Sequence, residues 1–209
     1  MRNTIAVVLV IAALTGGLIW YFLNQWSRGP VQTLAPSAEA ASRFSAKVLQ
    51  LTSPAPPDGE ASVVLSELEI NSYLALKLTS LVPRGVRELQ VQLGARESAI
   101  KALVDFDELK RDSNVKSNVL IDGLLRGQHQ LRIKGTFESE DYTGKYVVTS
   151  VRLDQNELPP QLIDLLTKRL KLRYQIAKPN TPFNLPGGIR KIEVQSGKLV
   201  VHRSSRPQK

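Results

Sequence analysis

The stretch SELEINSYLALKLTSL, Ser66 to Leu81, decides the fold because it carries the clearest helix signal outside the N-terminal apolar run. Ser66 is a preferred N-cap residue, and Glu69 three positions later completes a capping box. Pro83 ends the pattern, because the residue before a proline avoids the helical conformation. The apolar side chains spread round most of the helix, which predicts a long helix wrapped on several sides. They are Leu68, Ile70, Tyr73, Leu74, Leu76, Leu78 and Leu81.

Segments in which polar and apolar residues alternate follow this helix and predict the strands that wrap it. Three hairpins are expected, over residues 89–106, 131–153 and 189–202. Their short turns favour antiparallel pairing. A further helix is expected over residues 158–172, whereas residues 108–127 give no clear pattern. The sequence therefore predicts an α+β fold, with a curved antiparallel sheet wrapped around a long helix.

The N-terminal run TIAVVLVIAALTGGLIWYFL, Thr4 to Leu23, predicts a transmembrane helix. At ~1.5 Å per residue, about twenty apolar residues cover the ~30 Å hydrocarbon core of a bilayer. The alternative is a cleaved signal peptide that uses the triplet at residues 38–40. That triplet lies farther from the apolar run than the usual spacing, so we expect the span to be retained.

The charges that flank the span predict its orientation. Arg2 and the amino group stand on one side against Arg28 on the other, which favours a cytoplasmic N-terminus. We therefore expect a signal-anchored, single-pass protein of the bacterial inner (cytoplasmic) membrane, with its C-terminal domain periplasmic or extracellular.

Four parts follow from this pattern. Residues 1–28 are the cytoplasmic tip and anchor, residues 29–60 a stalk with a short helix and a proline-rich linker, residues 61–203 a single ectodomain, and residues 204–209 a basic tail. The helix of the stalk is expected over residues 39–51 from its apolar spacing.

The composition is that of a globular chain with a basic surface. Hydrophobic residues make up 42% of the 209 residues and charged residues 22%, and the net charge is +9. The chain has no cysteine, which excludes disulfides and cysteine-ligated metals. A positive field favours an anionic partner, and outside the cytoplasm we expect anionic membrane lipids rather than nucleic acid. A basic surface that only aids solubility is the alternative.

No pattern of a catalytic site stands out. The sequence has no nucleophile elbow, phosphate-cradling glycine loop or internal repeat. Asp105, Asp107 and Asp112 lie close together, but they lack the spacing of a calcium loop and are expected to be solvated. His129 and His202 have no acid or nucleophile motif nearby. We therefore expect no enzymatic activity, no metal and no cofactor.

Three short motifs occur in the predicted ectodomain: LSELEINSYL (Leu65–Leu74), VRLDQNELPPQLIDLL (Val151–Leu166) and LPGGIRKIEVQSGKLVV (Leu185–Val201). Together they resemble bacterial membrane-anchored proteins of the YpmS-type and LmeA-type families. The resemblance implies a fold similar to the tubular lipid-binding (TULIP) superfamily, a half-barrel in which an antiparallel sheet is rolled round a long helix. It also implies an apolar groove for lipid tails, and no catalytic residues. Residues 108–127 have no clear counterpart in that pattern.

Two functions from different classes follow, and the resemblance favours the first. In the first, the domain is a non-enzymatic protein that binds lipid or another amphiphile in an apolar groove. The groove candidates are Leu74, Leu78, Val91, Val104, Phe106, Ile133, Val151, Leu162 and Leu166. The candidates for contact with anionic headgroups are Lys168, Lys171, Arg173, Arg203 and Arg206.

The alternative is a membrane-anchored scaffold or envelope-assembly factor with a filled core and a protein partner in the cell envelope. Leucines that line a groove and leucines that fill a core give the same sequence pattern. The sequence therefore leaves both functions open, together with the oligomeric state.

Overall fold

The structure, a computed structural model, describes residues 35–53, 61–78, 82, 84–112, 126–159, 163, 181–186 and 188–204. Its helices are α2 (Ala38–Thr52), α3 (Glu67–Lys77) and α4 (Phe106–Asp112). Its strands are β1 (Ala61–Ser66), β2 (Val86–Leu93), β3 (Glu97–Asp105), β4 (Gln128–Glu140), β5 (Thr143–Leu153), β6 (Asn156–Glu157), β7 (Phe183–Asn184), β8 (Ile189–Gln195) and β9 (Lys198–Arg203). The three predicted hairpins are confirmed as β2–β3, β4–β5 and β8–β9.

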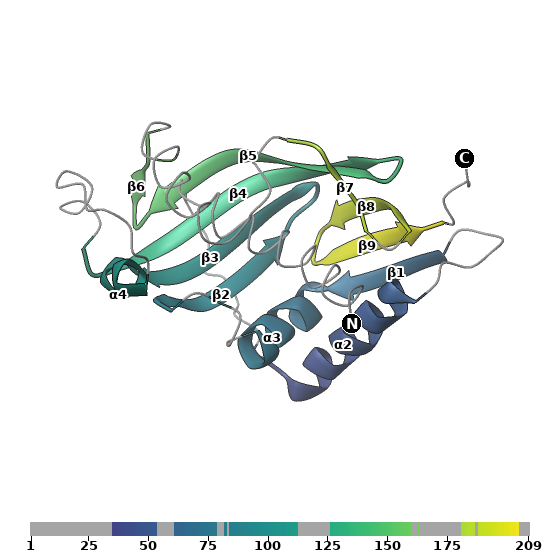
Figure 1. Cartoon of the computed structure of the whole chain (residues 1–209), viewed down its shortest axis with the longest axis horizontal. Helices are drawn as coiled ribbons and strands as arrows, with labels where there is room; N and C mark the ends of the chain where they lie inside the picture. Colours follow the sequence, from purple (N-terminus) through teal and green to yellow (C-terminus); the bar gives the residue numbers. More distant parts are fainter. Residues whose placement is uncertain are drawn as a thin grey trace.

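The strands form two antiparallel sheets that lie side by side (Figure 1). The larger has the order β2-β3-β4-β5-β6, with β7 paired to β5, and the smaller has the order β1-β9-β8. Ser139 of β4 joins them, since its hydroxyl bonds both the N–H and the C=O of Ile192 in β8, each at 2.7 Å. The backbone N–H of Tyr142 donates to Arg190 O at 2.9 Å beside it.

One hydrophobic core connects both sheets to α2 and α3. Helix α2 contributes Phe44, Val48 and Leu51, which pack in the same cluster as Leu74 of α3 and Ile133 of β4. The sequence analysis predicted this helix, over residues 39–51, as part of a stalk outside the domain. The structure shows that it belongs to the core of the domain.

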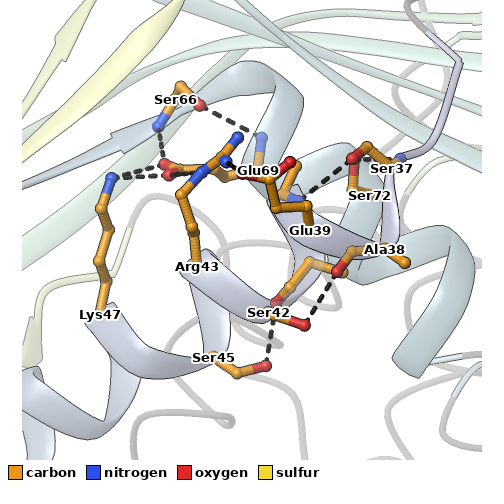
Figure 2. Close-up of polar contacts among 12 residues, drawn as sticks. Ser37, Ala38, Glu39, Ser42, Arg43, Ser45, Lys47, Ser66, Glu69 and Ser72 are labelled. Carbon is orange, nitrogen blue, oxygen red and sulfur yellow. Dashed lines mark hydrogen bonds and ion pairs between the residues drawn. The ribbon is translucent and has the colours of Figure 1, made fainter.

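The predicted start of the central helix is confirmed. Ser66 accepts a hydrogen bond from the Glu69 N–H, and the Glu69 carboxylate accepts one from the Ser66 N–H at 2.9 Å. Glu69 is 3% exposed, and its two carboxylate oxygens lie 2.7 and 2.8 Å from the Lys47 ammonium of α2 (Figure 2). The same carboxylate thus caps α3 and fastens it to α2.

The predicted half-barrel is wrong. The fold is mostly antiparallel β-sheet with short helices, and the sheets are not curled round a helix. Helix α3 has 11 residues and ends at Lys77 instead of continuing to Leu81. The reason is that α3 buries one side, which includes Ile70 and Leu74, while Leu76 is 46% exposed. The strands of both sheets share one core with α2 and α3 instead.

The predicted membrane topology is also corrected. In the part of the chain that the structure describes, no helix is long and apolar enough to cross a membrane. The transmembrane, single-pass and signal-anchor assignments and the inner-membrane location are therefore not supported. The span expected over residues 4–23 lies outside the described residues, as does most of the helix expected over residues 158–172.

Candidate functional site

The larger sheet has one apolar face and one polar face, because successive side chains of a strand point to opposite sides. Val91, Ile100, Ile133 and Val151 lie opposite one another across β2 to β5, and all four are buried in the core. The neighbouring positions on these strands share the other face.

That other face carries a row of three cations. Lys101 of β3 lies directly opposite Arg132 of β4, and Arg132 lies directly opposite Arg152 of β5. The Cβ atoms of such cross-strand pairs are about 4.5–5.5 Å apart. Gln90 of β2 extends the row beyond Lys101. One strip across four strands therefore holds three positive charges and one amide.

A second row on the same face runs beside the first. It consists of Gln92, Ala99, Lys134 and Ser150. Lys134 and Ser150 are each two residues from an arginine of the first row, and residues two apart on a strand share a face. We call Lys101, Arg132, Lys134 and Arg152 the basic cluster.

Local sequence explains how these cations come together. In the segment LRIK of β4, Leu131 and Ile133 face the core, so Arg132 and Lys134 must face the other way. Tight turns fix the register of the two hairpins, with Arg96 at φ 74° after β2 and Tyr142 at φ 65° after β4. A one-residue slip would move the cations into the core.

The basic cluster is partly inside the protein. Arg132 is only 8% exposed and donates from Nη2 to Gln92 Oε1 at 3.1 Å. Lys134, at the rim, forms an ion pair with Glu97 at 3.2 Å. A second acidic residue adjoins the cluster, because Glu157 of β6 lies directly opposite Arg152.

Burial and the repulsion of neighbouring cations disfavour the charged forms of Lys101 and Arg132. Burial, and then the positive charge of Arg132, lower the pKa of Lys101 below its ordinary value. Burial, and then the charge of Arg152, lower the pKa of Arg132, while Glu97 acts in the opposite direction. Like charges directly opposite one another destabilise a sheet. An anion placed among these side chains would offset that cost.

The chemistry that this arrangement offers is recognition of a negative charge. A guanidinium presents a planar fork of N–H donors that matches the oxygens of carboxylates and phosphates. Among the described residues, no group of three or more His, Asp or Glu could hold a metal ion.

A second polar group, on the smaller sheet, resembles a catalytic triad in composition. Ser62 Oγ lies 3.0 Å from His202 Nδ1, and His202 Nε2 lies 3.7 Å from Glu193 Oε1. Glu193 is also paired with Lys191 at 2.7 Å. Ser62 lies within a paired strand, whose N–H groups point along the sheet and cannot converge on an oxyanion above it. This group is a surface ladder of polar side chains.

Two other residues singled out from the sequence have structural roles. The Asp105 carboxylate caps α4, accepting from the N–H groups of Asp107 at 3.1 Å and Glu108 at 2.9 Å. His129 lies with Nδ1 2.7 Å from Asp154 and Nε2 2.8 Å from the Arg126 carbonyl. Both arrangements stabilise the end of the larger sheet at which α4 begins.

The structure places seven groove candidates together in one buried cluster. These are Leu74, Leu78, Val91, Val104, Phe106, Ile133 and Val151. The other two, Leu162 and Leu166, lie outside the described residues. Contact with a lipid tail stays a prediction for this set.

Of the five headgroup candidates, Arg203 alone lies in the part of the chain that the structure describes. Lys168, Lys171, Arg173 and Arg206 lie outside the described residues. Arg203 is buried, and its guanidinium donates to the carbonyls of Gln50, at 2.8 Å, and Ser53 at the end of α2. Sequence reasoning missed the basic cluster, although the alternation in β4 could have indicated that Arg132 and Lys134 share a face.

Comparison with known proteins adds no assignment. No protein-family model matches the chain, and no curated protein matches it. The resemblance to the YpmS-type and LmeA-type families therefore stays a prediction.

Proposed function

We propose that this domain is a non-enzymatic binding protein for an anionic lipid or another anionic amphiphile. The observation that carries the proposal is the basic cluster, in which Lys101, Arg132 and Arg152 lie in register on one face of the sheet. The net charge of +9 acts in the same direction, because it raises the local concentration of anions near the protein.

The burial of the cluster favours a small anionic group over an extended polyanion. Nucleic acid is bound through cations that reach out to a line of phosphates. Arg132 is 8% exposed and Lys101 is partly buried, so these side chains suit a group that enters the protein. Half-buried Leu103, two residues from Lys101 on the same face, offers apolar surface next to the charges.

A second candidate function is a scaffold with a filled core. The observation that favours it is the close packing of seven groove candidates in one cluster, which includes Ile133 at 0% and Val151 at 1% exposure. In such a protein the basic cluster would contact an acidic partner, and no amphiphile would be bound.

The test begins with the purified full chain. Organic extraction followed by mass spectrometry should yield an anionic amphiphile. The thermal midpoint should rise with octyl phosphate or octanoate, both below their micellar concentrations, and should not change with uncharged octyl glucoside. A chain that yields no amphiphile and responds to neither anion would contradict the proposal and favour the scaffold.

A further inference from the structure

Two buried polar atoms on β5 lie beside the cationic row. Ser150 Oγ and Arg152 Nε are shielded from solvent and have no hydrogen-bond partner among the residues that the structure describes. Buried polar groups in folded proteins nearly always have a partner, so each exception needs an explanation. Both atoms belong to the same face of the same strand, two residues apart.

Their cross-strand neighbours are cations. Ser150 lies directly opposite Lys134, and Arg152 directly opposite Arg132. These four side chains occupy the corners of a rectangle, about 5 Å across the strands and about 7 Å along them. Lys101 adjoins the rectangle on the next strand. A single small anion above the rectangle is within reach of the guanidiniums and the hydroxyl.

We propose that the group bound here is a phosphate-type dianion, held by Arg132 and Arg152 with Ser150 as a neutral donor and Lys101 beside them. The proposal rests on the proposed function, because it names the anionic group of the same ligand. The source of that group is either the headgroup of an amphiphile or free phosphate.

The charge and shape of the site favour phosphate over carboxylate. A phosphate monoester carries about −1.5 to −2 charges at pH 7 and presents three acceptor oxygens, whereas a carboxylate carries one charge and two oxygens. Two guanidinium forks in register, with the Ser150 hydroxyl in the neighbouring row, provide donors in more than one plane, which suits a tetrahedral group. With Glu157 directly opposite Arg152, the row of three cations keeps an excess of about two positive charges (3 − 1), which a dianion balances better than a monoanion.

Isothermal titration of the full chain in phosphate-free buffer tests the proposal with four probes. These are inorganic phosphate, octyl phosphate, octanoate and octyl glucoside. We expect octyl phosphate to bind at least about tenfold more tightly than octanoate, which corresponds to about 1.4 kcal/mol. Octyl glucoside should not bind through this site.

Variants separate a ligand site from a structural role. Arg152→Gln should raise the Kd for octyl phosphate at least about tenfold, while the thermal midpoint without ligand changes little, because the like-charge pair with Arg132 and the opposite-charge pair with Glu157 are removed together. Ser150→Ala should raise the Kd several-fold with little effect on the unliganded protein. Lys198→Gln is the matched control, because it removes one exposed positive charge from β9 on the smaller sheet.

Each outcome is decisive for one of the two proposals. Octanoate binding as tightly as octyl phosphate would overturn the phosphate assignment and leave the proposed function standing. Inorganic phosphate binding as tightly as octyl phosphate would support the assignment with free phosphate as the source. Octyl phosphate binding that inorganic phosphate does not share supports a lipid headgroup. Absence of binding by every anion overturns both proposals, and an unchanged Kd in Arg152→Gln overturns this location.

Discussion

The side-chain amide of Asn71 forms two hydrogen bonds with the backbone of Val91, accepting from its N–H at 2.7 Å and donating to its C=O at 2.8 Å. Glu67, one turn earlier on α3, accepts from the Leu93 N–H at 2.7 Å. Strand β2 is the edge of the larger sheet, and an open edge exposes unpaired backbone groups. Side chains of helix α3, rather than the backbone of another strand, therefore satisfy the backbone groups at this part of the edge.

Replacing Asn71 with Ala should lower the free energy of unfolding by about 2–3 kcal/mol, because two hydrogen bonds are lost and two part-buried backbone groups lose their partners. Urea denaturation measures this change. Lys77→Ala, at an exposed position of the same helix, is the control and should change stability by less than about 0.5 kcal/mol. Equal effects of the two substitutions would show that α3 does not close the edge of β2.

The Glu69 carboxylate should make stability depend on pH. Burial alone would raise its pKa, but hydrogen bonds from the Lys47 ammonium and the Ser66 N–H and the charge of Lys47 outweigh burial, so the pKa lies below the ordinary 4.5. A group whose pKa is lowered by folding stabilises the protein above its unfolded pKa and loses that effect as pH falls through the folded pKa.

Glu69→Gln should therefore cost about 2 kcal/mol at pH 7, through the loss of hydrogen bonds to a charged group. The difference between the two proteins should shrink as pH falls below the ordinary carboxyl value of 4.5. Urea titrations at pH 7 and pH 3.5 measure it. A difference that grew on acidification would contradict the role of the carboxylate drawn in Figure 2.

Local signals in the sequence were enough to predict several elements. The capping box at Ser66 and Glu69 depends on residues three apart, and the structure confirms it. The hairpins depend on alternation and short turns, so β4 and β5 could be paired without knowledge of the rest of the chain. The length of α3 could not be predicted, because apolar residues such as Leu76 are exposed here instead of buried.

The candidate site depends on contacts that local patterns do not contain. The cationic row exists because β3 pairs with β4 in the register that puts Lys101 opposite Arg132. This pairing joins segments on either side of residues 108–127, whose sequence shows no clear pattern. The role of α2 was missed for a similar reason. An amphipathic helix before a proline-rich segment gives no sign that Phe44 packs in the same core as Leu74 and Ile133.

Gly135 should be needed for the packing of Tyr146. A Cβ atom added to Gly135 would lie 2.5 Å from Cζ and 2.6 Å from Oη of Tyr146. The Tyr146 hydroxyl oxygen also lies 3.1 Å from Ser98 Oγ, which holds the ring in place. Gly135→Ala should therefore destabilise the protein by about 1–3 kcal/mol through overpacking. A double-mutant cycle in urea tests the cause, because the penalty should largely disappear when Tyr146 is replaced by Ala. A penalty that persisted there would point to the strand backbone instead.

The structure and the sequence assign different roles to Arg203. In the structure it attaches α2 to β9, whereas the sequence predicted contact with lipid headgroups. Its side chain is 4% exposed and donates to the carbonyls of Gln50 and Ser53, which holds the end of α2 to β9. Arg203→Met keeps much of the apolar stem and removes these donors, so it should cost about 2–4 kcal/mol of stability. Urea denaturation measures the loss, with Lys198→Gln as the exposed control on the same strand.

Sedimentation with vesicles containing phosphatidylserine gives the second measurement for Arg203→Met. Unchanged stability with weakened vesicle binding would support headgroup contact, whereas lost stability with unchanged binding assigns Arg203 to the attachment of α2.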